Sequence, residues 1–187
     1  TLVTRGAEIP GSALAALERA RQAGIDVVLA TGRRFRSAHP VAAQFDRRPD
    51  LVCLGGALLK GHRDHRPPAP AVPFAGPPCG VSGYGTLEAR GLAPDVGRAV
   101  VRAAREAGHP VIVQVDHPVD AAVDFLVDDA VPWNRETAED AALAADAARP
   151  VDALEYLGAH GALILSLYDT VPRIEAFAVR LLERLGA

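Results

Sequence analysis

The segment 12–34 joins a helix pattern to a strand pattern through one glycine, and this junction constrains the fold more than any other feature. Leucine and alanine recur at helical spacing up to Gly24, which is placed to end the helix. Residues 25–30, IDVVLA, form a short run rich in β-branched side chains, which predicts a strand buried on both faces. Helix, glycine and buried strand together make half of a βαβ unit, so the sequence predicts an α/β fold with parallel strands.

The rest of the chain divides into three regions of different character. Residues 1–60 continue the α/β pattern with a second helix and a second parallel strand, LVCL at residues 51–54. Residues 61–91 are rich in proline and glycine, so we expect a linker with little regular structure. Residues 92–187 alternate helix and strand patterns, which is typical of an α+β domain with helices packed on one face of a small sheet.

Charge and composition exclude several classes of partner. The formal net charge is -3 and the pI is about 6.0, which leaves no basic footprint for nucleic acid or an anionic membrane. The longest apolar stretch, residues 51–59, is about half of the roughly 20 residues that cross a bilayer. We therefore set nucleic acid and membranes aside as partners, and the sequence carries no signal for an oligomeric state.

The cysteines and the first residue bear on where the protein works. The two cysteines allow at most one disulfide, and Cys53 lies in an apolar run, which favours a reducing cytoplasm. No signal-peptide pattern is present. The sequence contains no methionine and begins at Thr1, so we expect either a removed initiator or further sequence upstream.

The turn after the first predicted strand is the best candidate site. Thr31 and Gly32 follow the strand directly and precede a predicted helix. A hydroxyl, a glycine amide and the first amides of a helix then meet at the carboxyl end of a parallel strand, where α/β sheets bind ligands. Arg33 and three basic residues after it add positive charge, although an arginine cluster is also typical of a solvated helix face. The residues alone favour an anion site and a solvated face equally.

A family resemblance extends this interpretation. The strings IPGSALAALERARQAGIDVVLATGRR at residues 9–34 and LVCLGGALLK at residues 51–60 resemble the opening of Cof-type phosphatases of the haloacid dehalogenase superfamily. In that family a strand carrying D-x-D-G-T-L comes first, and the opening Thr1-Leu2 matches its last two letters. The resemblance implies a partial Rossmann-like core over residues 1–60. It also implies that residues 61–91 lead into an inserted α+β cap domain over residues 92–187.

The resemblance also implies roles for individual residues. It implies that the Thr31 hydroxyl binds the phosphate and that the Gly32 amide donates a hydrogen bond to it. It also implies that Arg33 lines the substrate entrance together with Gly55 and Gly56. Where this chain has Gly55-Gly56, the family usually has Asn-Gly. The polar contact that the asparagine side chain would make is therefore lost in this chain.

The family mechanism uses two aspartates, one as nucleophile and one as general acid and base, with Mg²⁺ held by further acidic residues. Both aspartates would precede the first residue, and the metal-binding segment would follow the last. No catalytic residue and no metal ligand is therefore assigned to this chain, and we expect it to be inactive as given. We also expect the strand at residues 25–30 to have an unpaired edge, and residues 1–60 to fold poorly or to pair with another chain.

Three functions remain in consideration. The first is a Mg²⁺-dependent phosphatase of small phosphorylated metabolites, sugar phosphates included. The second is a shortened, non-catalytic domain that binds a phosphorylated ligand or a partner protein. The third, a nucleotide-binding module, lacks the G-x-G-x-x-G fingerprint.

Two further residue sets were considered as sites. Asp124, Asp128 and Asp129 are closely spaced, and we expect them to be solvated loop or helix-end charges. His62, His65 and Cys79 offer only three zinc ligands with an irregular gap, which argues against a zinc site.

Overall fold

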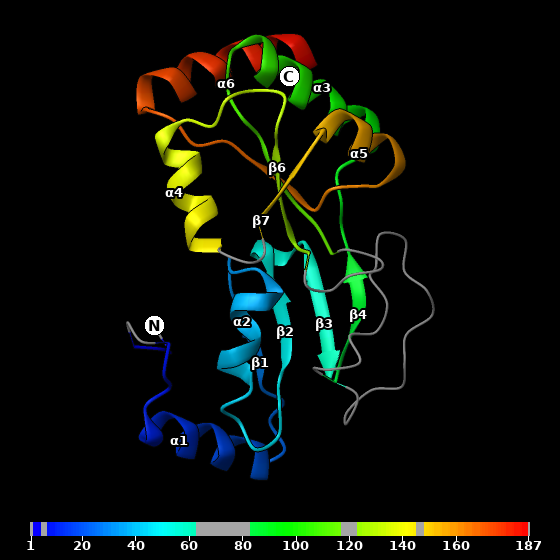
Figure 1. Ribbon diagram of the computed structural model, residues 1–187. Helices are drawn as coiled ribbons and strands as arrows, with labels where there is room; N and C mark the ends of the chain where they lie inside the picture. The colour runs from blue at the N-terminus through cyan, green and yellow to red at the C-terminus, as the bar shows by residue number, and fades with distance from the viewer. Residues whose placement is uncertain (1, 5–6, 63–82, 117–122, 145–147, 187) are drawn as a thin grey trace. The chain divides into compact units, whose positions relative to one another are not determined.

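The computed structural model describes residues 2–4, 7–62, 83–116, 123–144 and 148–186. It divides the chain into two compact units, Thr1–Arg90 and Gly91–Ala187, and each unit contains a four-stranded sheet (Figure 1). The predicted mixed α/β architecture with parallel strands and helices is confirmed. Among the described helices, none combines the length and the apolar character that a membrane crossing requires.

The first unit contains a mixed sheet with the strand order β1-β2-β3-β4. Strands β1 and β2 are parallel, whereas β3 is antiparallel to both β2 and β4. Its elements are α1 (Gly11–Gln22), β1 (Val28–Ala30), α2 (Phe35–Ala42), β2 (Asp50–Cys53), the short 3-10 helix η1 (Leu54–Gly56), β3 (Leu58–His62) and β4 (Tyr84–Ala89). Gly24 follows α1 with a φ of 82°, as expected for a glycine that ends a helix.

Helix α2 packs on one face of this sheet. The ring of Phe35 meets Tyr84 of β4 edge-on with centroids 5.4 Å apart, and His39 meets the same tyrosine at 5.9 Å. The Nζ atom of Lys60 lies 5.2 Å from the centroid of Phe35 and donates a 2.7 Å hydrogen bond to Thr86 Oγ1. The first turn of α2, next to the Thr31 turn, is therefore anchored to the sheet.

Strand β1 differs from the prediction for residues 25–30. The strand covers only three residues and lies at the end of the sheet order. Ile25 is 58% exposed and Val28 is 51% exposed, so the predicted burial on both faces is wrong. The reason is that a local apolar run does not reveal which faces other elements cover, and Ile25 lies before the strand begins. The pairing of β1 with β2 alone among the described strands agrees with the expected unpaired edge.

Strand β4 corrects a second expectation. Little regular structure was predicted for residues 61–91, yet β3 extends to His62 and β4 pairs with it over residues 84–89. The prolines of this region all precede β4, so they do not interrupt its ladder. Tyr84 is fully buried and donates a 2.6 Å hydrogen bond from its hydroxyl to Pro49 O.

The second unit contains a sheet with the strand order β7-β6-β5-β8. Strand β5 is antiparallel to β6 and β8, and β6 is parallel to β7. The elements are α3 (Pro94–Glu106), β5 (Ile112–Gln114), β6 (Phe125–Asp128), α4 (Arg135–Ala144), β7 (Ala148–Val151), α5 (Ala153–Ala159), β8 (Ile164–Ser166) and α6 (Val171–Leu185).

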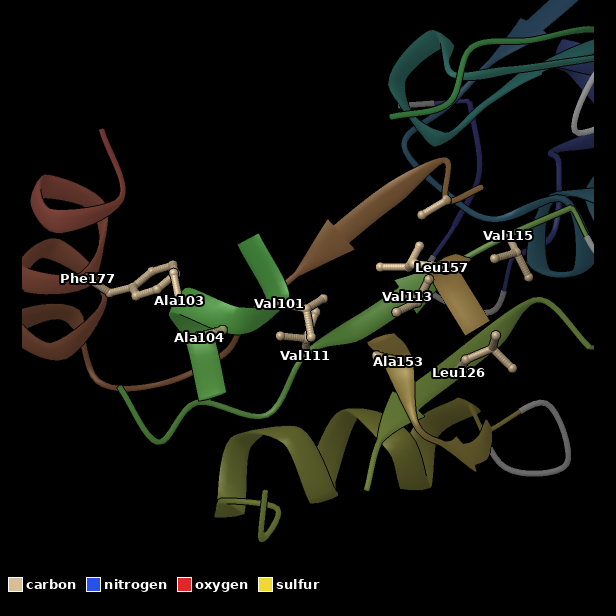
Figure 2. Packing of buried hydrophobic residues seen from close by; sticks show 11 residues of the cluster. Val101, Ala103, Ala104, Val111, Val113, Val115, Leu126, Ala153, Leu157 and Phe177 are labelled. Carbon is tan, nitrogen blue, oxygen red and sulfur yellow. The ribbon is translucent and has the colours of Figure 1, made fainter. Parts of the chain in front are cut away.

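Helices cover both faces of this second sheet. Val113 of β5 and Leu126 of β6 belong to the main core with residues of α3, α5 and α6 (Figure 2). Ile112 and Phe125, which alternate with them along the same strands, pack with Ala141 of α4 in a second cluster. The expectation of helices on one face is therefore wrong. Consecutive residues of a strand point to opposite faces of the sheet. Because consecutive residues of β5 and β6 are apolar, both faces must be buried.

Candidate functional site

The turn that follows β1 holds the Thr31 side chain in a defined orientation. The Thr31 N–H donates a 2.8 Å hydrogen bond to Val52 O, which extends the β1–β2 ladder by one residue. The Arg33 N–H donates to Thr31 Oγ1 at 3.1 Å. A hydroxyl has two lone pairs and one proton, so this bond uses one lone pair and leaves the O–H to donate to a ligand.

A second turn lies directly against the first. The Leu54 N–H donates to Arg33 O at 3.0 Å, and the Gly55 N–H donates to Thr31 O at 3.2 Å. The parallel pairing of β1 and β2 explains this contact, because their carboxyl ends meet at the same edge of the sheet. The structure thus brings together Thr31, Arg33 and Gly55, which the sequence placed in one site.

The residues of this second turn have left-handed backbone conformations. The φ angles are 53° at Leu54, 61° at Gly55 and 106° at Gly56. Both glycines are exposed, and a Cβ built on either would meet nothing within 4 Å. Glycine is therefore favoured at these positions by the backbone conformation and not by crowding.

A cavity of about 200 Å³ opens beside Thr31. It is smaller than the roughly 300–1,000 Å³ of pockets that enclose a whole small molecule, so it suits a single small group. Thr31 and Arg33 supply its polar lining, and the remaining lining residues are Leu2, Val3, Leu29, Ala30, Ala38, Val41 and Leu51. Gly32 is exposed on the same turn.

Helix α2 begins immediately after this turn. Its N-cap residue, Arg34, makes no side-chain capping hydrogen bond to the helix. The positive end of the helix dipole and the first N–H groups of α2 therefore favour an anion at the turn. Further along α2, burial lowers the pKa of His39, and the nearby Arg48 and His62 lower it further.

Neither of the other two residue sets forms a site in the described structure. Asp128 is fully buried and accepts hydrogen bonds from Arg105 at 2.8 and 2.6 Å and from the Ala153 N–H at 3.1 Å. Asp124 is only 8% exposed, so the expectation of solvated charges is wrong for these two aspartates, whereas Asp129 is exposed. Asp128 is buried because Arg105 and the start of α5 satisfy its carboxylate.

Of the three residues that the sequence argues against as a zinc site, the structure describes only His62. His62 is buried, its N–H donates to Asp50 Oδ1 at 3.1 Å, and its ring lies 4.9 Å from that of Tyr84. His65 and Cys79 lie outside the described residues. Across the part of the chain that the structure describes, no three metal-ligating side chains gather closely enough to hold an ion.

Sequence reasoning missed several residues of the site. Leu2 and Val3 line the cavity because the start of the chain lies against the end of β1. Leu54 links the two turns through its N–H, but a positive φ at leucine is too rare to be predicted. The adjacent Gly-Gly pair was the one signal that pointed to this turn.

The fold is that of phosphatases of the haloacid dehalogenase superfamily. BT1666 of Bacteroides thetaiotaomicron, a phosphatase of this superfamily, aligns with a TM-score of 0.67 at 18% identity, over 97% of this chain and 57% of its own. TM0651 of Thermotoga maritima aligns with a TM-score of 0.68 at 18% identity, over 100% of this chain and 59% of its own. The subclass IIB sugar phosphatase BT4131 aligns with a TM-score of 0.59 at 16% identity, over 98% of this chain and 59% of its own.

A family model matches the first part of the sequence. Residues 1–66 match the model described as haloacid dehalogenase-like hydrolase. The superfamily predicted from the strings at residues 9–34 and 51–60 is therefore confirmed. No curated protein matches the chain. The chain spans 57–59% of the length of the three solved structures named above.

Proposed function

We propose that this chain is part of a phosphatase of small phosphorylated metabolites, and that Thr31, Gly32 and Arg33 bind the phosphoryl group. The observation that carries the proposal is the Thr31 hydroxyl, which is fixed by the Arg33 N–H beside a cavity of about 200 Å³ at the carboxyl end of β1. The family match over residues 1–66 supports the reaction class. The sugar phosphatase among the structural neighbours supports sugar phosphates as a substrate class for the assay.

The three residues have distinct tasks in this proposal. The Thr31 O–H donates to one phosphate oxygen, and the exposed Gly32 lets the backbone approach the anion without a side chain in the way. The Arg33 guanidinium supplies positive charge at the cavity. Together with the N-terminus of α2, these groups orient a phosphate monoester and stabilise its charge.

The described residues do not form a Mg²⁺ site. None of the described residues that line the cavity carries a carboxylate, and Mg²⁺ prefers oxygen ligands in an octahedral arrangement. Mg²⁺ therefore enters the proposal only as the cofactor of the family. We expect the 187-residue chain to bind phosphate without turnover, because loss of a catalytic nucleophile costs on the order of 10⁶ in rate.

The second unit is proposed to be the cap domain, with residues 61–91 leading into it. Its own sheet and its own core support a separate folding unit, and the solved neighbours align over nearly all of the chain. In this role it would select the substrate. A cytoplasmic location is also part of the proposal.

A second candidate function is a non-catalytic domain that binds a phosphorylated ligand. It is favoured by the Thr31 hydroxyl and the Arg33 side chain, which line a cavity large enough for a single small group. Under this proposal, the function of the chain is to bind the ligand, and it does not hydrolyse it.

One assay separates the two functions. Phosphate release from a panel of phosphometabolites is measured with Mg²⁺, for this chain and for a version that includes the flanking coding sequence on both sides. Turnover by the longer version alone supports the phosphatase, and binding without turnover by both supports the binding domain. Comparable turnover by the short chain would contradict the proposal that the catalytic groups lie outside it.

A further inference from the structure

Gly55 contacts the candidate site through its backbone. The family resemblance predicts that it lines the substrate entrance, and in the structure its N–H donates to Thr31 O at 3.2 Å. The neighbouring Leu54 N–H donates to Arg33 O at 3.0 Å, and Val52 O accepts from the Thr31 N–H at 2.8 Å. The β2–η1 segment thus holds both ends of the Thr31–Arg33 turn.

These contacts depend on the left-handed conformation of two consecutive residues. Leu54 and Gly55 have φ angles of 53° and 61°: the conformation of Leu54 orients the Gly55 N–H toward Thr31 O, and that of Gly55 turns the chain toward β3. Leu54 is an unfavourable residue for this conformation, yet its side chain is only 5% exposed and anchors the turn in the core. Gly55 adopts the same conformation without steric cost.

We propose that the Leu54–Gly55 turn is the positioning element of the phosphate-binding turn, and that Gly55 acts through Thr31 without touching the ligand. This inference rests on the proposed function, because it assigns a role in phosphate binding. Because pairing with β2 fixes β3 after this turn, a Gly55 backbone that leaves the left-handed region must displace the peptide before it and weaken its hydrogen bond to Thr31 O. The fraction of molecules with a correctly placed Thr31 hydroxyl then falls, and the apparent affinity falls by the same fraction.

The test compares Gly55→Val with Gly55→Asn in the 187-residue chain. Valine disfavours a positive φ strongly and asparagine tolerates it, so the pair separates backbone conformation from the mere presence of a side chain. A Cβ at this position meets nothing within 4 Å, so neither variant creates a clash there at Cβ. Gly11→Val serves as the surface control, because Gly11 begins α1 and its Cβ also meets nothing within 4 Å.

Inorganic phosphate is titrated into each ¹⁵N-labelled protein, and the amide signals of Thr31 and Arg33 report the affinity. We expect Gly55→Val to bind about tenfold more weakly, in line with the cost of a left-handed conformation for an L-residue. Gly55→Asn should recover most of the affinity, and Gly11→Val should bind like the unmodified chain. Thermal unfolding of the same samples shows whether affinity changes independently of stability.

The outcomes distinguish the inference from the proposed function. If the unmodified chain does not bind phosphate, the proposed function fails and the inference fails with it. If it binds and Gly55→Val binds equally well, or if both Gly55 variants are equally weak, the inference alone is overturned. If Gly55→Val does not fold, the inference is tested instead by the rate of hydrogen exchange at the Gly55 amide of the unmodified chain, with and without phosphate. We expect phosphate to slow this exchange, and an unchanged rate would refute the inference.

Discussion

Replacing Thr31 by valine removes one oxygen and leaves the side-chain shape almost unchanged. That oxygen accepts the Arg33 N–H at 3.1 Å, and its proton is the proposed donor to phosphate. The Arg33 N–H is exposed and can bond water in the variant, so we expect a stability loss near the low end of the roughly 0.5–1.5 kcal/mol of a hydrogen bond. A hydrogen bond to a charged group contributes about 1.5–3 kcal/mol. The dissociation constant for phosphate should therefore rise roughly 10- to 150-fold.

The assay is calorimetric titration of the folded protein with inorganic phosphate, accompanied by thermal unfolding. Thr31→Ser keeps the hydroxyl and is the matched control, so its affinity should stay close to that of the unmodified chain. A valine variant that binds phosphate within about twofold of the serine variant would refute the assignment of Thr31, since RT ln 2 is far below one charged hydrogen bond.

Two further predictions concern stability. Arg105→Met leaves the fully buried Asp128 without its bidentate partner, and we expect urea denaturation to show a loss of about 3–5 kcal/mol; a loss below about 1 kcal/mol would contradict the burial argument. Burial lowers the pKa of His39, and the nearby Arg48 and His62 lower it further. His39 therefore binds a proton more readily in the unfolded chain than in the folded chain. The free energy of unfolding should therefore be highest above the unfolded histidine pKa of about 6.5 and fall as the pH drops below it. His39→Gln should reduce this slope, and equal slopes between about pH 5 and 8 would contradict the contribution of His39.

The α/β class and the superfamily could be predicted because their signals are local. The helix that ends at Gly24 and the Thr-Gly turn after the next strand lie within one short segment, and the structure shows both. The contact between Gly55 and the Thr31 turn follows from parallel pairing of β1 and β2, which the sequence also indicated.

The failures concern partners that lie far away along the chain. The burial of Asp128 depends on Arg105 of α3, 23 positions earlier, and a pattern of nearby aspartates does not reveal this pair. Strand β4 was missed because the prolines before it dominate the composition of its region. The exposure of Val28 was missed because a local apolar run does not reveal which faces other elements cover, whereas the end position of β1 agrees with the expected unpaired edge.

The most direct test of the anion site is a crystal structure of this chain soaked with tungstate, a heavy analogue of phosphate. The account predicts anomalous density beside the turn after β1, with an oxygen within about 2.5–3.0 Å of Thr31 Oγ1 and a second oxygen at the Gly32 amide. Tungstate bound only elsewhere, with Thr31 Oγ1 turned into the apolar wall of the cavity, would contradict the central claim.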